Sequence, residues 1–318
     1  MSHSAGNDHF NAGQGLSRRD FLRAAIVGGG IITFGGFTYA ALEINSRNSP
    51  PRLLWSEEFD APLDLVSQTN PHGKWRLNDV WQDLYAGYVD FGAGGNSCWM
   101  ANPNQTINGV AYNPLAVRNS VLRITARRAD PAALPAIEDC PWIGGMLISN
   151  TDRDDMTFSY GYYEFRARFP NPGRGMFPAI WLYAAHEKNE AAQAAAEIDL
   201  FEIFGNEGGQ PWVASLHAAQ SQNRGSGQVV IRSESETSAW HTYGLNWQED
   251  RMEFYRDRKL LKTVTGAAVQ NYAGCKMSIR MNYSMNATWF GAAQLSDAST
   301  PNELYADFDY VRQYDRPF

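Results

Sequence analysis

Short runs in which apolar and polar residues alternate recur along the chain from about residue 52 onward. In YGYYEFRARF, residues 160–169, Tyr163, Phe165 and Phe169 fall on one side of an extended chain, and Glu164 and Arg166 fall on the other. This period of two predicts a β-strand that packs over a core with one face. Similar runs, separated by Gly, Asn, Asp and Pro, are RLLWSEEF, SVLRITARR, GGMLIS, PAIWLY, EIDLFEIF, WVASLH, QVVIRS, WHTYGLNW, RMEFYR and DFDYVRQY. Many strands with little helical periodicity predict an all-β fold, a β-sandwich.

The chain shows no second linker and no internal repeat after about residue 52. Its one compositionally biased stretch is the alanine-rich AAQAAAE at 191–197, within a loop, residues 184–196, for which we expect a helical turn. The sequence therefore predicts a single domain over residues 46–318.

The first 45 residues have a different character. SRRDFLR, residues 17–23, resembles a twin-arginine export signal, and an uncharged, glycine-rich run follows from Ala24 to Leu42. We predict a signal segment with a short linker over residues 1–45, and therefore a periplasmic or secreted protein. Thr38 and Ala40 supply small residues before a cleavage site. The alternative is an uncleaved run that anchors the chain, its one expected contact with a membrane.

The run AAAEIDLFEIFG, residues 194–205, places three carboxylates in a strand that is otherwise apolar. Strict alternation puts Glu197 and Asp199 on one face but turns Glu202 toward the apolar side. Burial of a carboxylate among apolar side chains is costly. We therefore predict a β-bulge around Leu200 or Phe201, which resets the register so that all three carboxylates line one face.

Three neighbouring carboxylates repel one another, so one is expected to keep its proton to higher pH while another is ionised. Hydrolysis of a glycosidic bond needs such a pair: an acid that protonates the leaving oxygen, and a carboxylate that attacks the anomeric carbon or activates water. A metal site or a charged edge strand shows the same local pattern. The residues alone leave these alternatives open.

The composition of the chain indicates which classes of partner and which cysteine pairings to expect. The chain has 318 residues, 44% of them hydrophobic, which is enough for a sizeable core. Its 27 basic and 34 acidic residues give a net charge of −7 without a long basic run, so nucleic acid is not an expected partner. Cys98, Cys140 and Cys275 allow at most one intramolecular disulfide, and three buried thiols fit equally well. None of the three is expected to be catalytic.

EIDLFE resembles the catalytic signature E-x-D-x-x-E of family 16 glycoside hydrolases, and other segments resemble family segments in the same order. These are LLWSEEFD, YGYYEFRARFPNPGRGMFPAIWL, WVASLHA, WHTYGLNW and FDYVRQY, so the resemblance covers about residues 53–316. It implies a jelly-roll β-sandwich of two antiparallel sheets with a concave glycan-binding groove. It also implies a retaining endo-glycoside hydrolase that cleaves internal β-linkages by double displacement. The spacing before the last glutamate matches the bulged branch, which includes laminarinases, agarases and carrageenases.

The resemblance assigns roles to individual residues. Glu197 matches the nucleophile, Glu202 the general acid/base, and Asp199 the carboxylate that positions the nucleophile. His217 matches a family histidine on the neighbouring strand, and Trp181 an aromatic position close to the nucleophile strand, although a tryptophan there fits the core equally well.

Three further substrate-binding candidates are Trp240, Asn282 and Phe177. Trp240 shares the ambiguity of Trp181. Asn282 lacks the glycine pair that usually follows it in the family, and Phe177 stands where the family often has tryptophan. These departures leave the polysaccharide open among a β-glucan, a galactan and a bacterial exopolysaccharide. Asp309 matches a ligand of a structural calcium found in many family members. The chemistry itself needs no cofactor.

Two other functions fit the same fold. A catalytically silent carbohydrate-binding protein is expected to have lost one of the glutamates, and both are present. A transglycosylase keeps them and lets a sugar intercept the covalent intermediate. We therefore predict a hydrolase that acts as a monomer on a polysaccharide.

Overall fold

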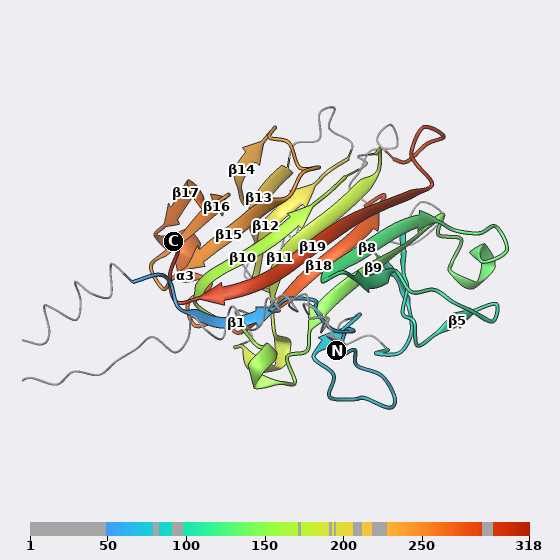
Figure 1. Cartoon of the computed structure of the whole chain (residues 1–318), viewed down its shortest axis with the longest axis horizontal. Helices are drawn as coiled ribbons and strands as arrows, with labels where there is room; N and C mark the ends of the chain where they lie inside the picture. Colours follow the sequence, from blue (N-terminus) through green and yellow to red (C-terminus); the bar gives the residue numbers. More distant parts are fainter. Residues whose placement is uncertain are drawn as a thin grey trace, which may run out of the picture. The chain divides into compact units, whose positions relative to one another are not determined.

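The computed structural model describes residues 49–78, 83–90, 98–170, 173–190, 193, 195–205, 212–217, 228–287 and 295–318. A compact unit extends from Leu53 to Phe318, and its regular structure is almost entirely β-strand (Figure 1). The predicted signal segment lies outside the described residues. Among the residues described, no helix has the length and hydropathy needed to cross a membrane.

One antiparallel sheet, sheet B, has the strand order β2-β9-β18-β11-β12-β13-β14. Its strands are β2 (Trp75–Arg76), β9 (Trp142–Ser149), β11 (Met176–Ala184), β12 (Glu197–Ile203), β13 (Trp212–His217), β14 (Gln228–Ser233) and β18 (Met277–Met285). The carboxylate strand β12 therefore lies inside the sheet, between β11 and β13.

The second sheet, sheet A, has the order β17-β16-β15-β10-β19-β8-β7, with β1 beside the end of β19. Its strands are β1 (Leu53–Glu57), β7 (Leu115–Arg118), β8 (Val121–Arg128), β10 (Gly161–Arg168), β15 (His241–Trp247), β16 (Arg251–Arg256), β17 (Lys259–Thr265) and β19 (Glu303–Tyr314). β9 joins the two sheets, because its first residues pair with β8 and with β4 (Cys98–Met100), while its last residues pair with β18. β3 (Tyr88–Asp90) pairs with β4.

The remaining elements are short. β5 (Thr106–Ile107) and β6 (Val110–Ala111) form a small hairpin, α3 spans Ala267–Gln270, and 3₁₀ turns span Leu134–Ala136, Asp154–Met156 and His186–Lys188. The last of these turns lies in the loop for which the sequence predicts a helical turn.

The core lies between the two sheets. Phe201 of β12 stacks on Phe169, which follows β10 of sheet A, with ring centroids 4.2 Å apart. The same Phe201 ring contacts Trp212 of β13 and Tyr243 of β15. Aromatic contacts from both sheets thus meet in one buried cluster. This arrangement confirms the predicted all-β sandwich of two antiparallel sheets.

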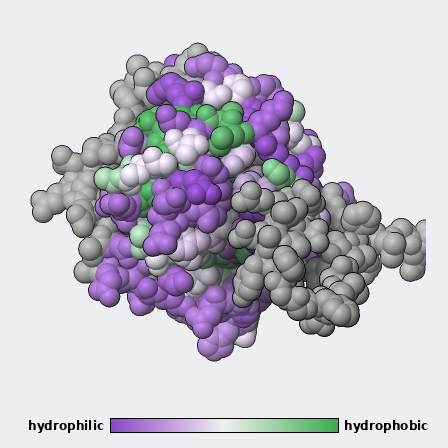
Figure 2. Space-filling model, turned by 90° about the vertical axis from the view of Figure 1, so that its left-hand side faces the viewer, coloured by the Kyte–Doolittle hydropathy of each residue, from purple (hydrophilic) through white to green (hydrophobic). Residues whose placement is uncertain are grey.

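The edge strand β17 is the most exposed strand of sheet A. Leu260 and Leu261 are 53% and 46% exposed, with Lys259 and Lys262 on either side of them. Charged side chains on an edge strand discourage pairing with another chain. Figure 2 shows the side of the molecule that lies at the left in Figure 1, where a hydrophobic area is surrounded by hydrophilic residues.

The three cysteines are free and buried. Burial raises the pKa of the Cys140 and Cys275 thiols to about 11, and it also raises the pKa of Cys98. Protonated, buried thiols are poor nucleophiles. The sequence left two alternatives open, one disulfide or three buried thiols, and the structure has the three buried thiols.

Candidate active site

The register of β12 shifts within the strand. Asp199 lies opposite Trp181 of β11, whereas Phe201 lies opposite Ile180, so Leu200 has no partner of its own in β11. The register with β13 shifts over the same stretch. One extra residue on one strand restores the alternation beyond it. The residue after Phe201 therefore returns to the face that carries Asp199.

Glu197, Asp199 and Glu202 share the outward face of sheet B, because the residues between them belong to the core cluster. Their exposure differs: the side chain of Glu197 is 27% exposed, while Asp199 and Glu202 are only 2% and 9% exposed. One carboxyl group thus faces solvent, and two are largely withdrawn from it.

The neighbouring strand β13 adds two polar side chains to this face. His217 lies opposite Glu197 in the register, and its Nε2 is 3.9 Å from Glu197 Oε1 and 3.0 Å from Asp199 Oδ2. Ser215 lies opposite Asp199, and its hydroxyl donates a 3.3 Å hydrogen bond to Glu202 Oε2. The period of two along β13 therefore brings an imidazole and a hydroxyl to the three carboxylates.

Burial and mutual repulsion perturb the two inner carboxyl groups. Burial raises the pKa of Asp199 well above its ordinary value, and the charge and hydrogen bonding of Glu197 raise it further. Burial likewise raises the pKa of Glu202, followed by the charges of Asp199 and Glu197, while His217 and the Ser215 hydroxyl act in the opposite direction. A carboxyl group that keeps its proton near neutral pH is suited to act as a general acid.

Trp181 is fixed on this face by Asn282. The indole Nε1 of Trp181 donates a 2.8 Å hydrogen bond to Asn282 Oδ1, and Asn282 Nδ2 donates to the carbonyl oxygen of Phe177 at 3.2 Å. Asn282 is 1% exposed. It therefore holds Trp181 in place and does not present its own amide to solvent.

Phe177 lies on the same strand as Trp181 but is covered. Only 3% of the residue is exposed, and its ring stacks on Phe204 with centroids 5.4 Å apart. Ala287 and Leu295 complete this small cluster. Phe177 supports the end of the sheet and does not offer an open ring to a sugar.

Trp240 and Asp309 lie on the outward face of sheet A and not with the carboxylates. The guanidinium carbons of Arg166 and Arg168 lie 4.9 and 4.8 Å from the centre of the Trp240 ring, and Arg166 Nη1 donates to Asp309 Oδ2 at 2.6 Å. These arginines alternate with the core residues of β10, so they point away from the core. The structure thus does not bring Trp240 to the three carboxylates.

The predicted calcium ligand Asp309 is 4% exposed and already paired with the Arg166 guanidinium. Among the described side chains, no group of three metal ligands includes Asp309. A calcium ion bound by this carboxylate would compete with the guanidinium for the same oxygen. The calcium site stays a prediction, and no step of the chemistry depends on it.

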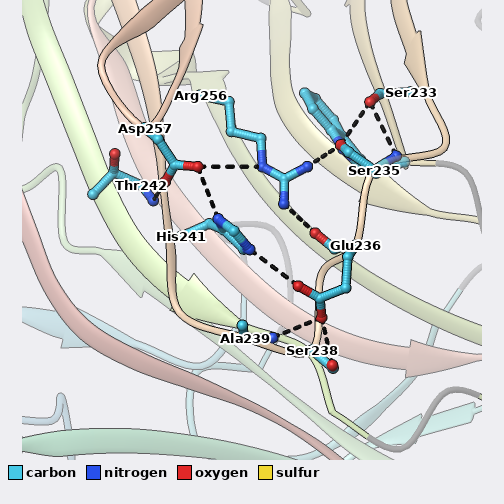
Figure 3. A network of polar contacts seen from close by, with 10 residues as sticks. Ser233, Ser235, Glu236, Ser238, Ala239, His241, Thr242, Arg256 and Asp257 are labelled. Atoms are coloured by element: carbon cyan, nitrogen blue, oxygen red, sulfur yellow. Dashed lines mark hydrogen bonds and ion pairs between the residues drawn. The ribbon is translucent and has the colours of Figure 1, made fainter.

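The residue after Trp240 belongs to a polar network on sheet A (Figure 3). His241 Nδ1 lies 2.9 Å from Asp257 Oδ2, and its Nε2 lies 3.2 Å from Glu236 Oε2. Arg256 donates to the hydroxyl of Ser235 and to the backbone oxygen of Glu236. The network ties the loop before β15 to the hairpin of β15 and β16, so its contacts indicate a structural role.

Three residues near the carboxylates were not singled out from the sequence: Ser215, Tyr183 and Arg280. Tyr183 lies opposite Glu197 in the register. Arg280 is 4% exposed, and its guanidinium carbon lies 4.8 Å from the Trp181 ring and 4.5 Å from the Tyr183 ring. Each of the three stands two positions from a predicted site residue. The alternation of the strands was therefore the signal that could have identified them.

The model of the family described as "Glycosyl hydrolases family 16" matches residues 108–310. The chain belongs to glycosyl hydrolases family 16.

Relatives of the chain include two proteins of Rhizobium meliloti (strain 1021). Endo-1,3-1,4-beta-glycanase ExsH is 27% identical over 238 residues, which are 74% of this chain and 48% of that protein. Endo-1,3-1,4-beta-glycanase EglC is 30% identical over 222 residues, 66% of this chain and 45% of that protein. The chain thus spans about half the length of these relatives. A beta-1,3-glucan-binding protein of Penaeus monodon is 30% identical over 131 residues, 38% of this chain and 36% of that protein.

Solved structures of laminarinases share the fold. The laminarinase catalytic domain from Thermotoga maritima MSB8 has a TM-score of 0.57 at 18% identity and covers 83% of this chain and 98% of that chain. The laminarinase from Rhodothermus marinus has a TM-score of 0.57 at 22% identity and covers 84% of this chain and 97% of that chain. At these identities the likeness establishes the jelly-roll fold alone.

Proposed function

We propose that the chain is a retaining endo-hydrolase of β-glucans that contain 1,3- or 1,4-linkages. The observation that carries the proposal is the set Glu197, Asp199 and Glu202 on one face of sheet B, with graded exposure and a raised pKa at Glu202. The names of the two Rhizobium relatives support the choice of substrate class. The register shift in β12 agrees with the bulged, laminarinase-like branch of the family.

The first step transfers the glycosyl group to the protein. Glu197, the most exposed of the three carboxylates, attacks the anomeric carbon and forms a glycosyl ester. The bond to the leaving oxygen breaks, and this oxygen takes the proton of Glu202. Asp199 lies between them and holds Glu197 through the hydrogen bond and the charge that the two groups share.

The second step returns the protein to its starting state. Glu202, now ionised, removes a proton from a water molecule, whose oxygen attacks the anomeric carbon. The ester bond to Glu197 breaks, and its carboxylate is regenerated. Two inversions give net retention of configuration. The stereochemistry of the first product therefore tests the mechanism separately from the substrate.

The experiment is an assay of new reducing ends on laminarin, mixed-linkage β-glucan, agarose, carrageenan and a bacterial exopolysaccharide. We expect cleavage of one of the two glucans, with a rapid fall in polymer size because the attack is internal. Glu197→Gln should lower the rate by at least about a thousandfold. The matched control is Glu303→Gln, the same change at an exposed glutamate at the start of β19, which should leave the rate unchanged.

The glucan-binding relative makes a silent binding protein the second candidate. If a gel that contains glucan retards the chain but the chain cleaves none of the glycans, the result would support that candidate and reject the hydrolase. Cleavage of agarose or carrageenan alone would keep the hydrolase but reject the glucan. Products longer than the substrate would indicate transglycosylation. An inverted anomer in the proton NMR spectrum would reject the double displacement.

We also propose that the chain is exported through its twin-arginine segment. The proposal rests on Arg18 and Arg19 and on the uncharged run after them. Replacement of both arginines by lysine should retain the protein in the cytoplasm of its host, as measured by cell fractionation. The mass of the exported form distinguishes a cleaved signal from an anchor. Export of the double variant at the normal level would contradict the proposal.

A further inference from the structure

Glu197, Asp199 and His217 form a cluster of metal-ligating side chains on the outward face of sheet B. One donor atom from each lies within 4.8 Å of the other two. His217 Nε2 is 3.0 Å from Asp199 Oδ2 and 3.9 Å from Glu197 Oε1. Two ligands of a tetrahedral ion, each about 2.0–2.2 Å from it, are about 3.3–3.6 Å apart. Side-chain shifts of about 1 Å or less would therefore surround one ion.

Oδ2 of Asp199 points into this cluster without a satisfactory hydrogen-bond donor among the described residues. His217 Nε2 is close to it, but the contact does not have hydrogen-bond geometry. Asp199 is 2% exposed, so this oxygen is largely withdrawn from bulk solvent. A buried carboxylate oxygen is ordinarily satisfied by a donor or a cation. A cation bound at the cluster would satisfy this oxygen.

The other two ligands are accessible and well fixed. The side chains of Glu197 and His217 are each 27% exposed, so an ion can reach them from solvent and keep a water molecule as its fourth ligand. The two residues lie directly opposite each other in β12 and β13. Ligands on paired strands are held in place before the ion arrives, which favours binding.

We propose that Glu197, Asp199 and His217 bind one Zn²⁺ ion and that the bound ion blocks glycan cleavage. One imidazole and two carboxylates form a donor set that suits zinc, whereas Ca²⁺ and Mg²⁺ favour six or more oxygen ligands. The binding stands on the geometry of the cluster. The inhibition rests on the proposed function, because a Glu197 oxygen bound to zinc is no longer free to attack the anomeric carbon.

Binding is tested without any glycan. The full chain is freed of metal with a chelator, dialysed and titrated with Zn²⁺ by calorimetry, and with Co²⁺ by visible absorption, which reports the ligand geometry. We expect one Zn²⁺ per cluster, and at least about tenfold weaker binding by His217→Ala. The matched control His72→Ala removes an exposed imidazole elsewhere and should bind as the unchanged chain does. Circular dichroism of each variant verifies that it is folded.

Absence of Zn²⁺ binding, or equal affinity in His217→Ala, would overturn the site. Displacement by an equal concentration of Mg²⁺ would overturn the choice of zinc. These outcomes do not depend on whether the chain cleaves a glycan.

Inhibition is tested on the glucan that the chain cleaves. We expect activity to fall over the same range of Zn²⁺ concentration in which the site fills, and to return when the ion is chelated. Activity that persists at a filled site would overturn the inhibition but not the binding. If activity required the metal, Zn²⁺ would be an activator and not an inhibitor. That result would support the alternative that the carboxylates serve a metal site. Zinc binding by a chain that cleaves no glycan would reject the proposed function and leave the site intact.

Discussion

The hydroxyl of Ser215 in β13 donates a 3.3 Å hydrogen bond to Oε2 of Glu202 in β12, across the two central strands of the candidate site. A donor to a carboxylate stabilises its ionised form and so lowers its pKa. Burial and neighbouring negative charges act in the opposite direction and prevail, so the pKa of Glu202 is raised. Ser215 therefore limits how strongly Glu202 holds its proton.

Ser215→Ala should move the alkaline limb of the activity profile to higher pH. Loss of the hydrogen bond raises the pKa of Glu202, so the general acid keeps its proton to higher pH. One such bond contributes about 0.5–1.5 kcal/mol, so kcat/KM at neutral pH should change by less than about tenfold. The measurement is kcat/KM against pH, with Ser215→Thr as the control that keeps a hydroxyl. An unchanged alkaline limb would mean that Glu202 does not set it.

Asn282→Ala should weaken catalysis through Trp181. The substitution removes the acceptor of the Trp181 Nε1 hydrogen bond and leaves a partly buried N–H unpaired, at a cost of about 1–2 kcal/mol. We expect kcat/KM to fall by about 5–30-fold, mostly through KM. Trp181→Phe keeps a ring but lacks the N–H. Since both changes break the same bond, the double variant should lose less than the two single losses combined. Full additivity would contradict the coupling.

Alternation in the sequence located strands well where one face of the strand packs on the core. The predicted segments 212–217, 228–233 and 251–256 have the same bounds as β13, β14 and β16. β18 was not predicted, although apolar and polar residues alternate along MSIRMNYSM; all nine of its residues are buried. β17, KLLKTVT, was missed because six of its seven residues are exposed and it has no continuous apolar face.

The placement of site residues depended on a different kind of information. The carboxylates of β12 share one strand, so alternation and a register shift were enough to place them together. Trp240 directly precedes a strand of sheet A, and a local motif does not tell which sheet that strand joins. Phe177 is covered by Phe204, a contact between residues far apart in the chain, which no local pattern reveals.

Glu164 is a buried charge on the outward side of sheet A, and we expect its ion pair with Arg258 to stabilise the fold. The residue has no exposed surface, and Arg258 donates two hydrogen bonds to it, at 2.9 and 3.0 Å. Tyr310 donates a third, at 2.9 Å. Arg258→Met leaves the carboxylate without its counterion and should lower the free energy of unfolding by about 2–4 kcal/mol.

Urea denaturation at neutral pH measures this loss. Arg251→Met is the matched control, because Arg251 is 44% exposed and pairs with an exposed Asp250, an interaction worth less than about 1 kcal/mol. Glu164→Gln in the Arg258→Met background should recover part of the stability, since it removes the unpaired charge. Equal losses for Arg258→Met and Arg251→Met would refute the importance of the buried pair.

The network around His241 should stabilise the chain less at acidic pH than at neutral pH. Hydrogen bonds from Ser238, His241 and the Ala239 N–H lower the pKa of Glu236 to about 2. A lowered carboxyl pKa gives stability that is present above its unfolded value of 4.5 and is lost as the pH falls toward 2. Because Glu236 is largely exposed, Glu236→Gln should cost less than about 1 kcal/mol at pH 7, and nothing near pH 2. Thermal unfolding at several pH values measures the difference, and a constant cost at every pH would contradict it.

Glu202→Gln should make the chain more stable while it abolishes the proposed acid catalysis. The pKa of Glu202 is raised from 4.5 in the folded chain, so the native state holds this proton more tightly than the unfolded state does. Its contribution to stability is therefore full below pH 4.5 and declines as the pH rises toward the folded pKa. Glutamine has nearly the same shape and does not ionise, so the decline disappears in the variant.

The melting temperature of Glu202→Gln should accordingly match that of the unchanged chain at pH 4 and exceed it increasingly as the pH rises toward the folded pKa of Glu202. A gain of about 1 kcal/mol corresponds to about 2–4 °C in a domain of this size. Glu303→Gln, at an exposed site, should show no such pH-dependent gain. Two parallel curves for Glu202→Gln and the unchanged chain would mean that burial does not perturb this carboxyl group. A widening gap would instead show that the buried acid destabilises the chain above pH 4.5, which is the cost expected of a buried proton donor.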